Sequence, residues 1–303
     1  MSSLAFLFPG QGAQTVGMGK SLYDSLPEAR RLFDESQSIL GYDLARICFE
    51  GPAESLDSTV HSQPALYVSS MAALASLRQE RPDRIAQCDI TAGLSLGEYT
   101  ALAFAGVFLF EDGLRLVQIR GEAMQAASDA APSGMVSILG LERSQIESLC
   151  DQHRHPGEVL QIANMLCPGN IVVSGSRTAC DRIYDAAPAA GAMKAIRLAV
   201  AGAFHTPLMQ SAVEKLRAAL EQVPMQAARI PVVSNVDAKP HTNPDEIREL
   251  LVKQVVSPVL WEDSLRWMIG DGCGEFCEIG AGRVLAGLLK RVDRKLKIEN
   301  VSA

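Results

Sequence analysis

Hydrophobic residues in the first 130 positions form two short apolar runs, separated by stretches with helical spacing. The runs at residues 4–8 and 88–93 predict buried strands, because each is brief and ends at a glycine- or proline-containing turn. Elsewhere in this part, apolar side chains recur every three or four positions, which predicts helices. The predicted helices cover residues 27–40, 62–80, 96–104 and 110–127.

The pattern changes after the segment 129–134. The predicted order is now strand, helix, strand, strand, helix, strand, at residues 135–139, 143–150, 159–162, 171–174, 178–187 and 192–198. This order indicates a small ferredoxin-like unit. Beyond residue 204, helices are expected at 210–221, 244–254 and 284–291, and strands at 230–234 and 275–279. Strands separated by helices favour a parallel sheet. The prediction is an α/β protein with a large domain (1–130 and 204–303) and an inserted ferredoxin-like subdomain (131–203).

The composition is that of an ordinary globular protein, with 48% hydrophobic and 21% charged residues. A net charge of −7 argues against a general nucleic-acid binder, which needs a basic face. No stretch approaches the roughly 20 apolar residues of a membrane span, and the run at 4–8 lacks the basic flank of a signal peptide. The seven scattered cysteines include no C-x-x-C pair, so we expect no metal cage, no disulfide framework and a reduced, cytoplasmic compartment.

The stretch GLSLG at residues 93–97 spells G-x-S-x-G between a predicted strand and a predicted helix. The pattern alone is weak, since it arises by chance in about one chain in ten of this length. Its context favours a nucleophile elbow, in which a tight turn exposes Ser95 and the N–H of Leu96 faces a developing oxyanion. The alternative is an N-capping serine in a capping box with Glu98.

A serine nucleophile needs a base, and the sequence offers five histidines. His153, His155 and His241 lie in polar or turn-rich segments, where a solvated histidine is the ordinary explanation. His61 opens a predicted helix, which favours a capping or surface role. His205 lies where the chain leaves the predicted insert and enters a helix. A junction loop at the sheet edge can hold an imidazole rigidly, so His205 is the preferred base.

Six short motifs occur in order along the chain. They are FPGQGAQ at 8–14, SLGEY at 95–99, QIRG at 118–121, AFHTPLM at 203–209, SNVD at 234–237 and EIGAG at 278–282. Together they resemble the malonyl-CoA:acyl carrier protein transacylase family, over about residues 4 to 292. The resemblance implies an α/β-hydrolase-like large domain without metal or redox cofactor. It also implies transfer of malonyl from malonyl-CoA to the phosphopantetheine thiol of acyl carrier protein through malonyl-Ser95, in fatty-acid biosynthesis.

The resemblance also assigns roles to individual residues. Ser95 matches the nucleophile and His205 its base, which would take the hydroxyl proton and return it to the leaving thiolate. A main-chain carbonyl at Gln254 is expected to hold the other imidazole N–H, although a polar residue at a helix end needs no such role. The main-chain N–H groups of Gln11 and Leu96 match the oxyanion hole, although a glycine-rich turn can simply join a strand to a helix.

Arg120 decides the expected substrate class. It lies on a predicted helix with apolar neighbours, and a buried guanidinium needs an anion. Its planar fork can bind a carboxylate through two parallel hydrogen bonds, and in the family it pairs with the free carboxylate of malonyl. The alternative is a surface arginine paired with Glu111 or Glu122. Phe204 resembles the bulky residue of malonyl-selective relatives, with discrimination of one methyl worth only about 1–3 kcal/mol.

The chain departs from the family pattern at three polar positions, two of which are leucines here. Leu94 stands where the family usually has histidine, and Leu166 where it commonly has asparagine; Asn170 replaces a glutamine. Our hypothesis is that Leu94 and Leu166 face each other, so that an apolar pair replaces a polar one without leaving an unsatisfied group. If so, Leu94→His alone should destabilise the fold.

The segment 290–297 holds five basic residues in an acidic protein. It could steer the docking of an acidic carrier protein, or it could be a solvated terminal helix whose cations favour the helix end.

Three other functions stay open from the sequence. A trans-acting acyltransferase of a polyketide synthase would share every motif. A serine hydrolase would replace the carrier thiol with water, but it would not need the carboxylate clamp of Arg120. A non-catalytic carrier-binding relative would have no reason to keep Ser95, His205 and Arg120 together.

Overall fold

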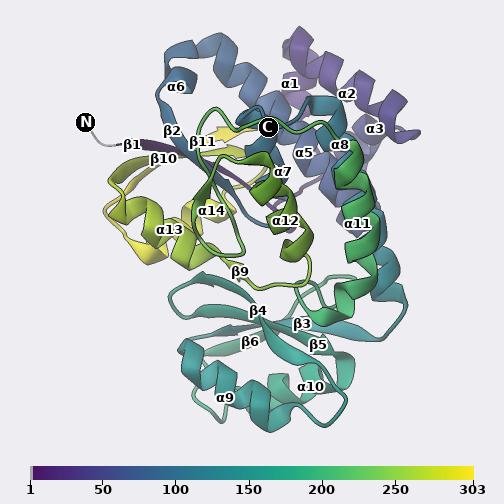
Figure 1. Ribbon diagram of the computed structural model, residues 1–303, viewed down its shortest axis with the longest axis vertical. Helices are drawn as coiled ribbons and strands as arrows, with labels where there is room; N and C mark the ends of the chain where they lie inside the picture. Colours follow the sequence, from purple (N-terminus) through teal and green to yellow (C-terminus); the bar gives the residue numbers. More distant parts are fainter. Residues whose placement is uncertain (1–2) are drawn as a thin grey trace.

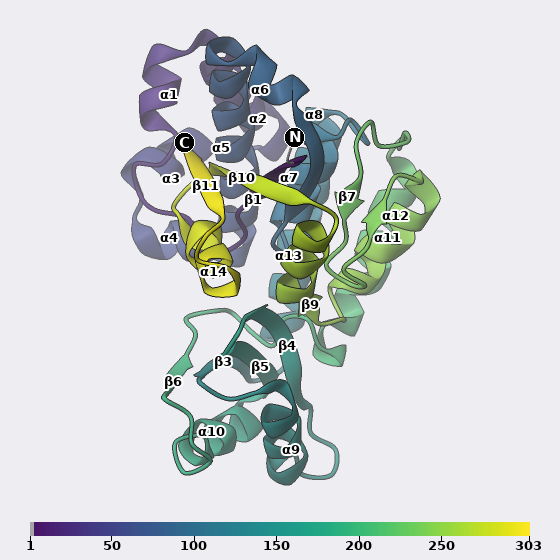
Figure 2. The same ribbon diagram turned by 90° about the vertical axis from the view of Figure 1, so that its left-hand side faces the viewer.

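The computed structural model describes residues 3–303, which form two sheets (Figures 1 and 2). The large sheet has the strand order β11-β10-β1-β2-β7-β8. All its pairings are parallel except the last, between β7 and β8. Its strands are β1 (Ser3–Phe8), β2 (Cys88–Gly93), β7 (Val232–Val233), β8 (Pro240–His241), β10 (Cys273–Gly280) and β11 (Lys297–Ser302).

Helices cover both faces of the large sheet because successive side chains of a strand point to opposite sides. In β1, Phe6 and Phe8 belong to one core cluster, together with side chains of α2, α5, α7 and α8. Ala5 and Leu7 belong to the other, together with α13 and α14. The helices of the large domain are α1 (Lys20–Ser25), α2 (Pro27–Leu40), α3 (Leu44–Glu50), α4 (Ala53–Asp57), α5 (Thr59–Glu80), α6 (Pro82–Ala86), α7 (Gly97–Phe104), α8 (Phe110–Asp129), α11 (Gln210–Gln222), α12 (Pro244–Gln254), α13 (Trp261–Gly270) and α14 (Val284–Val292).

The small sheet has the order β6-β3-β5-β4-β9 and lies below the large one in both views (Figures 1 and 2). Its elements are β3 (Ser133–Leu139), α9 (Arg143–His153), β4 (Leu160–Cys167), β5 (Asn170–Ser176), α10 (Arg177–Ala186), β6 (Lys194–Arg197) and β9 (Val259–Leu260). Helices α9 and α10 pack on one face. The first four strands have the ferredoxin-like arrangement. The fifth, β9, comes from the far side of α12 in the sequence and pairs in parallel with β4.

The predicted fold class is confirmed: a mixed α/β molecule with a mainly parallel sheet and a ferredoxin-like subdomain. The proposed residue boundaries of the two domains stay a prediction. Several elements were not predicted. Strand β11 is a half-buried edge strand with mixed polarity, and the helices α1, α3, α4 and α6 are five to seven residues long, too short for a helical period to stand out. Among residues 3–303, no helix is long and apolar enough to cross a membrane.

Candidate active site

A cavity of about 520 Å³ opens between the two sheets. Its lining includes the predicted nucleophile, base and arginine, which come from three separate parts of the sequence. The cavity lies at the carboxyl edge of the large sheet, where parallel α/β sheets usually bind ligands, and Ser95 follows the carboxyl end of β2 at this edge. The lining residues discussed below are Gln11, Leu94, Ser95, Leu96, Arg120, Asn164, Leu166, Asn170, Val172, Phe204, His205, Val284 and Leu288.

Ser95 occupies a sharp turn between β2 and α7. Its φ is 50°, a left-handed conformation that costs a non-glycine residue about 1–3 kcal/mol. The turn is tight because backbone packs on backbone: a Cβ at Gly93 would lie 1.9 Å from the carbonyl carbon of Gly97, and one at Gly97 would lie 2.1 Å from the carbonyl oxygen of Phe8. The side chain of Ser95 does not cap the helix. The capping-box alternative is therefore wrong, and the turn has the strand–turn–helix geometry of a nucleophile elbow.

His205 faces Ser95 across 2.9 Å, measured from Nε2 to Oγ. Its Nδ1 lies 2.8 Å from the main-chain carbonyl oxygen of Gln254. A carbonyl only accepts, so Nδ1 carries the proton and Nε2 is free to accept the serine hydroxyl. Burial, followed by the nearby charge of Arg120, lowers the pKa of His205 to about 4. The imidazole is therefore neutral at pH 7, as a general base must be.

Arg120 is 2% exposed and projects from α8 into the same site. One terminal nitrogen donates to Gln63 Oε1 at 2.7 Å. The other donates to Ser95 Oγ and to Gln254 Oε1, each at 2.9 Å. All three acceptors are neutral, and no carboxylate within residues 3–303 forms an ion pair with this guanidinium. The alternative of a surface arginine paired with a neighbouring glutamate is wrong.

Gln254, the last residue of α12, is fully buried and connects the other groups of the site. Its main-chain carbonyl holds His205, and its Oε1 accepts from Arg120. Its Nε2 donates to the Ser95 carbonyl oxygen at 3.0 Å and to Glu98 Oε2 at 2.7 Å. The sequence predicted only the main-chain contact. The amide side chain also links nucleophile, base and arginine, so the alternative of an ordinary polar helix end is wrong.

The two residues of the predicted oxyanion hole lie around the cavity that contains Ser95. Leu96 is buried at the start of α7, and Gln11 is half-buried in the turn after β1. Both residues line the cavity. Within residues 3–303 neither N–H is used in a hydrogen bond that stabilises a turn or a cap. The helix start adds positive potential at Leu96, so this corner suits an oxyanion.

The remaining predicted positions also lie around the cavity. Phe204 is 6% exposed, directly before the base. Leu94 and Leu166 are half-buried and pack on the same apolar cluster. The hypothesis that they form an apolar pair is therefore compatible with their placement. The other histidines do not line this cavity. His61 lies at the start of α5, where its main-chain N–H donates to the Oγ of the capping Ser58.

Sequence reasoning missed two functional contacts. Glu98 is 3% exposed and accepts hydrogen bonds from Gln254 and from the main-chain N–H of Asn235. Burial raises its pKa to about 7, although these hydrogen bonds oppose the shift. Asn235 is fully buried and bonds to the elbow itself. Both residues lie inside the six ordered motifs, which was the available signal, but nothing in the sequence indicates which groups they touch.

The sharp turn at Ser95, the serine–histidine pair and the corner that suits an oxyanion are the arrangement that acyl transfer through a serine requires. The chain belongs to the acyl transferase domain family, whose model matches residues 5–301, and within it to the malonyl CoA-acyl carrier protein transacylases. It is 43% identical over 302 residues to the malonyl CoA-acyl carrier protein transacylase of Bacillus subtilis, covering 100% of this chain and 94% of that protein.

Solved structures agree with this assignment. The acyl-carrier-protein-S-malonyltransferase of Bartonella henselae superposes with a TM-score of 0.96 at 38% identity, over 99% of this chain and 96% of that one. A malonyl-transacylase solved in complex with a type II PKS acyl-carrier protein gives a TM-score of 0.94 at 38% identity, again over 99% and 96%.

Proposed function

We propose that this protein transfers malonyl from malonyl-CoA to the phosphopantetheine thiol of an acyl carrier protein. The observation that carries the proposal is the guanidinium of Arg120, buried beside Ser95 with only neutral partners within residues 3–303. Leaving such a cation without an anion costs several kcal/mol. The free carboxylate of a malonyl group supplies that anion at the reacting serine, whereas an acetyl group does not.

In the first half-reaction the Ser95 hydroxyl attacks the thioester carbonyl carbon while His205 Nε2 takes the hydroxyl proton. The N–H groups of Leu96 and Gln11 donate to the tetrahedral oxyanion. Collapse breaks the C–S bond, and the imidazolium returns its proton to the coenzyme A thiolate. The contact from Arg120 to Oγ keeps one side of the hydroxyl oxygen occupied, so its hydrogen points at His205.

In the second half-reaction the carrier thiol gives its proton to His205 and attacks the carbonyl carbon of malonyl-Ser95. The C–O bond to Ser95 breaks, and the alkoxide recovers the proton from His205. Phe204 narrows the cavity next to the base and disfavours an α-methyl branch by about 1–3 kcal/mol. No metal or redox group takes part in this chemistry, and we place it in the cytoplasm, in keeping with free, buried cysteines.

Helix α14 is the proposed docking element for the carrier. Val284 and Leu288 line the cavity, and the exposed Lys290 and Arg291 follow one turn later. Part of this charge also has a structural use: the Lys290 ammonium donates to two carbonyls after the helix, and Arg291 donates to the Pro168 carbonyl oxygen at 3.3 Å. A charge reversal at the exposed Arg294 tests docking without breaking these bonds. Unchanged transfer to carrier would favour the purely structural explanation.

The decisive experiment is the intact mass of the protein after incubation with malonyl-CoA and then with holo acyl carrier protein. We expect a malonyl adduct on Ser95 that moves to the carrier. Ser95→Ala is the matched control and should show no adduct. Absence of an adduct on the natural protein would overturn the proposal, and loss of the adduct to water without carrier would favour a serine hydrolase.

The pathway is the finer part of the proposal. We favour fatty-acid biosynthesis, because relatives that are 43% and 41% identical are named malonyl CoA-acyl carrier protein transacylases. A polyketide carrier is the second candidate, since one similar transacylase was solved with a type II PKS carrier. Transfer rates to the two kinds of carrier distinguish these assignments.

A further inference from the structure

The motif SNVD at residues 234–237 has no part in the mechanism above, yet it contacts the nucleophile loop. Asn235 follows the short strand β7 and is fully buried. Its Oδ1 accepts the main-chain N–H of Ser95 at 2.6 Å. Its Nδ2 donates to the main-chain carbonyl of Gly93 at 2.8 Å. One side chain thus holds two backbone groups of the elbow, on either side of Leu94.

The elbow needs this support because its backbone leaves both the strand and the helix. With φ at 50°, the N–H of Ser95 has left the ladder of β2 and is not part of α7. A buried donor without a partner is costly, and so is a buried carbonyl. A primary amide is the one neutral side chain of this size that offers an acceptor and a donor side by side. Asparagine at 235 therefore satisfies both groups in a single conformation.

We propose that Asn235 is a positioning residue for acyl transfer, whose amide locks the elbow so that Ser95 Oγ points at His205 and the Leu96 N–H faces the cavity. This rests on the proposed function. Asn235 touches no reacting atom and acts only through the backbone of Ser95.

Glu98 fixes the amide in turn. Its Oε2 accepts the main-chain N–H of Asn235 at 3.1 Å and the Nε2 of Gln254 at 2.7 Å. The side chains of Gln254 and Asn235 hold the carbonyl oxygen and the N–H of Ser95. Both residues also bond to the Glu98 carboxyl group, Gln254 through its side chain and Asn235 through its main-chain N–H. Elbow, base holder and arginine are thereby fixed in register.

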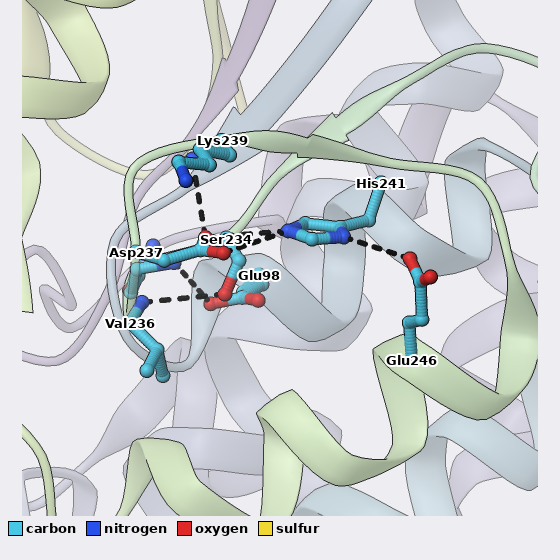
Figure 3. A network of polar contacts seen from close by, with 8 residues as sticks. Glu98, Ser234, Val236, Asp237, Lys239, His241 and Glu246 are labelled. Atoms are coloured by element: carbon cyan, nitrogen blue, oxygen red, sulfur yellow. Dashed lines mark hydrogen bonds and ion pairs between the residues drawn. The ribbon is translucent and has the colours of Figure 1, made fainter.

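The turn that carries Asn235 is braced on its outer side (Figure 3). His241 lies between two carboxylates, with Nε2 3.1 Å from Asp237 and Nδ1 3.2 Å from Glu246 on α12. Figure 3 also shows Glu98 next to this turn, at Ser234 and Val236. The turn is therefore tied to α7 through Glu98 and to α12 through His241, which keeps Asn235 beside the elbow.

The first test replaces the amide by a methyl group. Asn235→Ala should lower the rate constant of Ser95 acylation by about 100-fold, with the KM for malonyl-CoA changed less than about threefold, because Arg120 is untouched. The rate of Ser95 labelling by a fluorophosphonate, which needs no malonyl group, should fall in parallel. Thr91→Val is the control. Thr91 lies on β2, the strand that leads into the Ser95 turn, and its hydroxyl donates a buried hydrogen bond to the Phe6 carbonyl oxygen on β1. Removing this bond should lower stability without lowering either rate.

The second test keeps the shape and removes the donor. In Asn235→Asp a carboxylate oxygen can still accept from Ser95, but the other oxygen meets the Gly93 carbonyl without a hydrogen. Protonation of the introduced carboxylate restores the donor. The ratio of variant to natural acylation rate should therefore rise about tenfold as pH falls from about 8 to about 5, a range in which His205 stays neutral.

The pH test takes account of the other titratable or charged groups around this position, which the two proteins share. They are Glu98 on α7, Arg120 on α8, His205 in its loop, Asp237 and Lys239 on the turn, His241 on β8 and Glu246 on α12. Because these groups are common to both proteins, their own titration largely cancels in the ratio, which then follows the protonation of the introduced carboxylate and its effect on these neighbours. Asn235→Ala, which cannot gain a donor, should show a ratio independent of pH.

Two results would overturn the proposal: rates for Asn235→Ala within twofold of the natural protein, or a flat pH ratio for Asn235→Asp. Should Asn235→Ala fail to fold, the isosteric Asn235→Asp decides. The labelling arm separates this proposal from the proposed function. If the natural protein reacts with fluorophosphonate but not with malonyl-CoA, the proposed malonyl transfer is wrong. The role of Asn235 is then still tested by the labelling rate of Asn235→Ala.

Discussion

The two walls of the cavity are built on different principles. On the wall from the large domain, the polar groups around Ser95 are bonded to His205, Arg120, Gln254 and Asn235. The wall from strands β4 and β5 carries both apolar and polar side chains, namely Leu166 and Val172 with Asn164 and Asn170. Preorganised polar contacts stabilise the transition state, so a single substitution in the first wall disturbs several hydrogen bonds of the site at once. The second wall shapes a space, and an apolar residue there can replace a polar one.

The largest expected effect comes from breaking the first wall at Arg120. Arg120→Ala should lower the malonyl acylation rate of Ser95 by about 1,000-fold or more, and raise the preference for acetyl-CoA over malonyl-CoA. Arg120→Lys should be intermediate, because an ammonium cannot form the two parallel hydrogen bonds. Acylation kinetics with both thioesters measure this. Equal losses of acylation rate with malonyl-CoA and acetyl-CoA would mean that Arg120 does not bind the malonyl carboxylate.

The pH dependence sharpens the same comparison. His205 is buried next to a cation, which lowers its pKa to about 4, so the neutral base is present well below pH 6. The acylation rate should stay level from about pH 8 to about 5 and fall about tenfold per unit below about 4. Rapid-quench measurement of malonyl-Ser95 across pH checks this, with circular dichroism to confirm the fold. An acid limb near 6.5, the ordinary imidazole value, would contradict it.

Glu98 should affect stability through its proton. Its pKa of about 7 in the folded state lies above the ordinary 4.5, so the folded protein binds the proton more tightly than the unfolded chain. The stabilisation is full below about pH 4.5 and is lost as pH rises through 7. Relative to Glu98→Gln, the natural protein should therefore lose roughly 1–3 kcal/mol of unfolding free energy over this range. Urea unfolding at several pH values measures this. The prediction is refuted if the free energy of unfolding depends on pH in the same way for the natural protein and for Glu98→Gln.

The smallest effect is expected at the apolar lining of the cavity, at Leu94 beside Ser95 and Leu166 on the second wall. Leu94→His should destabilise the fold by about 1–2 kcal/mol, because it adds a polar group without a partner. Leu94→His combined with Leu166→Asn should recover part of that loss if the two side chains interact. A double-mutant cycle in urea measures the coupling. A gain in stability from the single change, or strictly additive losses, would rule out the paired exchange.

The sequence predicted most elements with strong periodicity and the residues that lie in distinctive motifs, although it missed the amphipathic helix α13. Helix α12 was expected with the observed ends, and Ser95, His205 and Arg120 meet in one cavity. One of the two interpretations of the charged segment 290–297 was a solvated terminal helix, but α14 ends at Val292 and strand β11 begins at Lys297. An edge strand with mixed polarity has no core face long enough to give a clear period of two.

The contacts of Glu98 and Asn235 were beyond sequence reasoning for another reason. They lie 137 positions apart, and their hydrogen bond depends on β2 and β7 being neighbours in the sheet. Periodicity reports which side of an element is buried, but it does not report which strands are neighbours. Topology therefore had to be known before the support of the elbow could be recognised.

Strand β9 has a consequence for how such a molecule could be remodelled. It completes the small sheet with residues 259–260, which belong to the large domain and follow Gln254 by only a few positions. Cutting out residues 131–203 would strip β9 of its partner, just beyond the carbonyl that holds the base. The subdomain therefore cannot be exchanged by itself. A subdomain taken from a relative would have to be transferred together with the segment that follows α12. Without that segment, the recipient protein would lose the support of its histidine base.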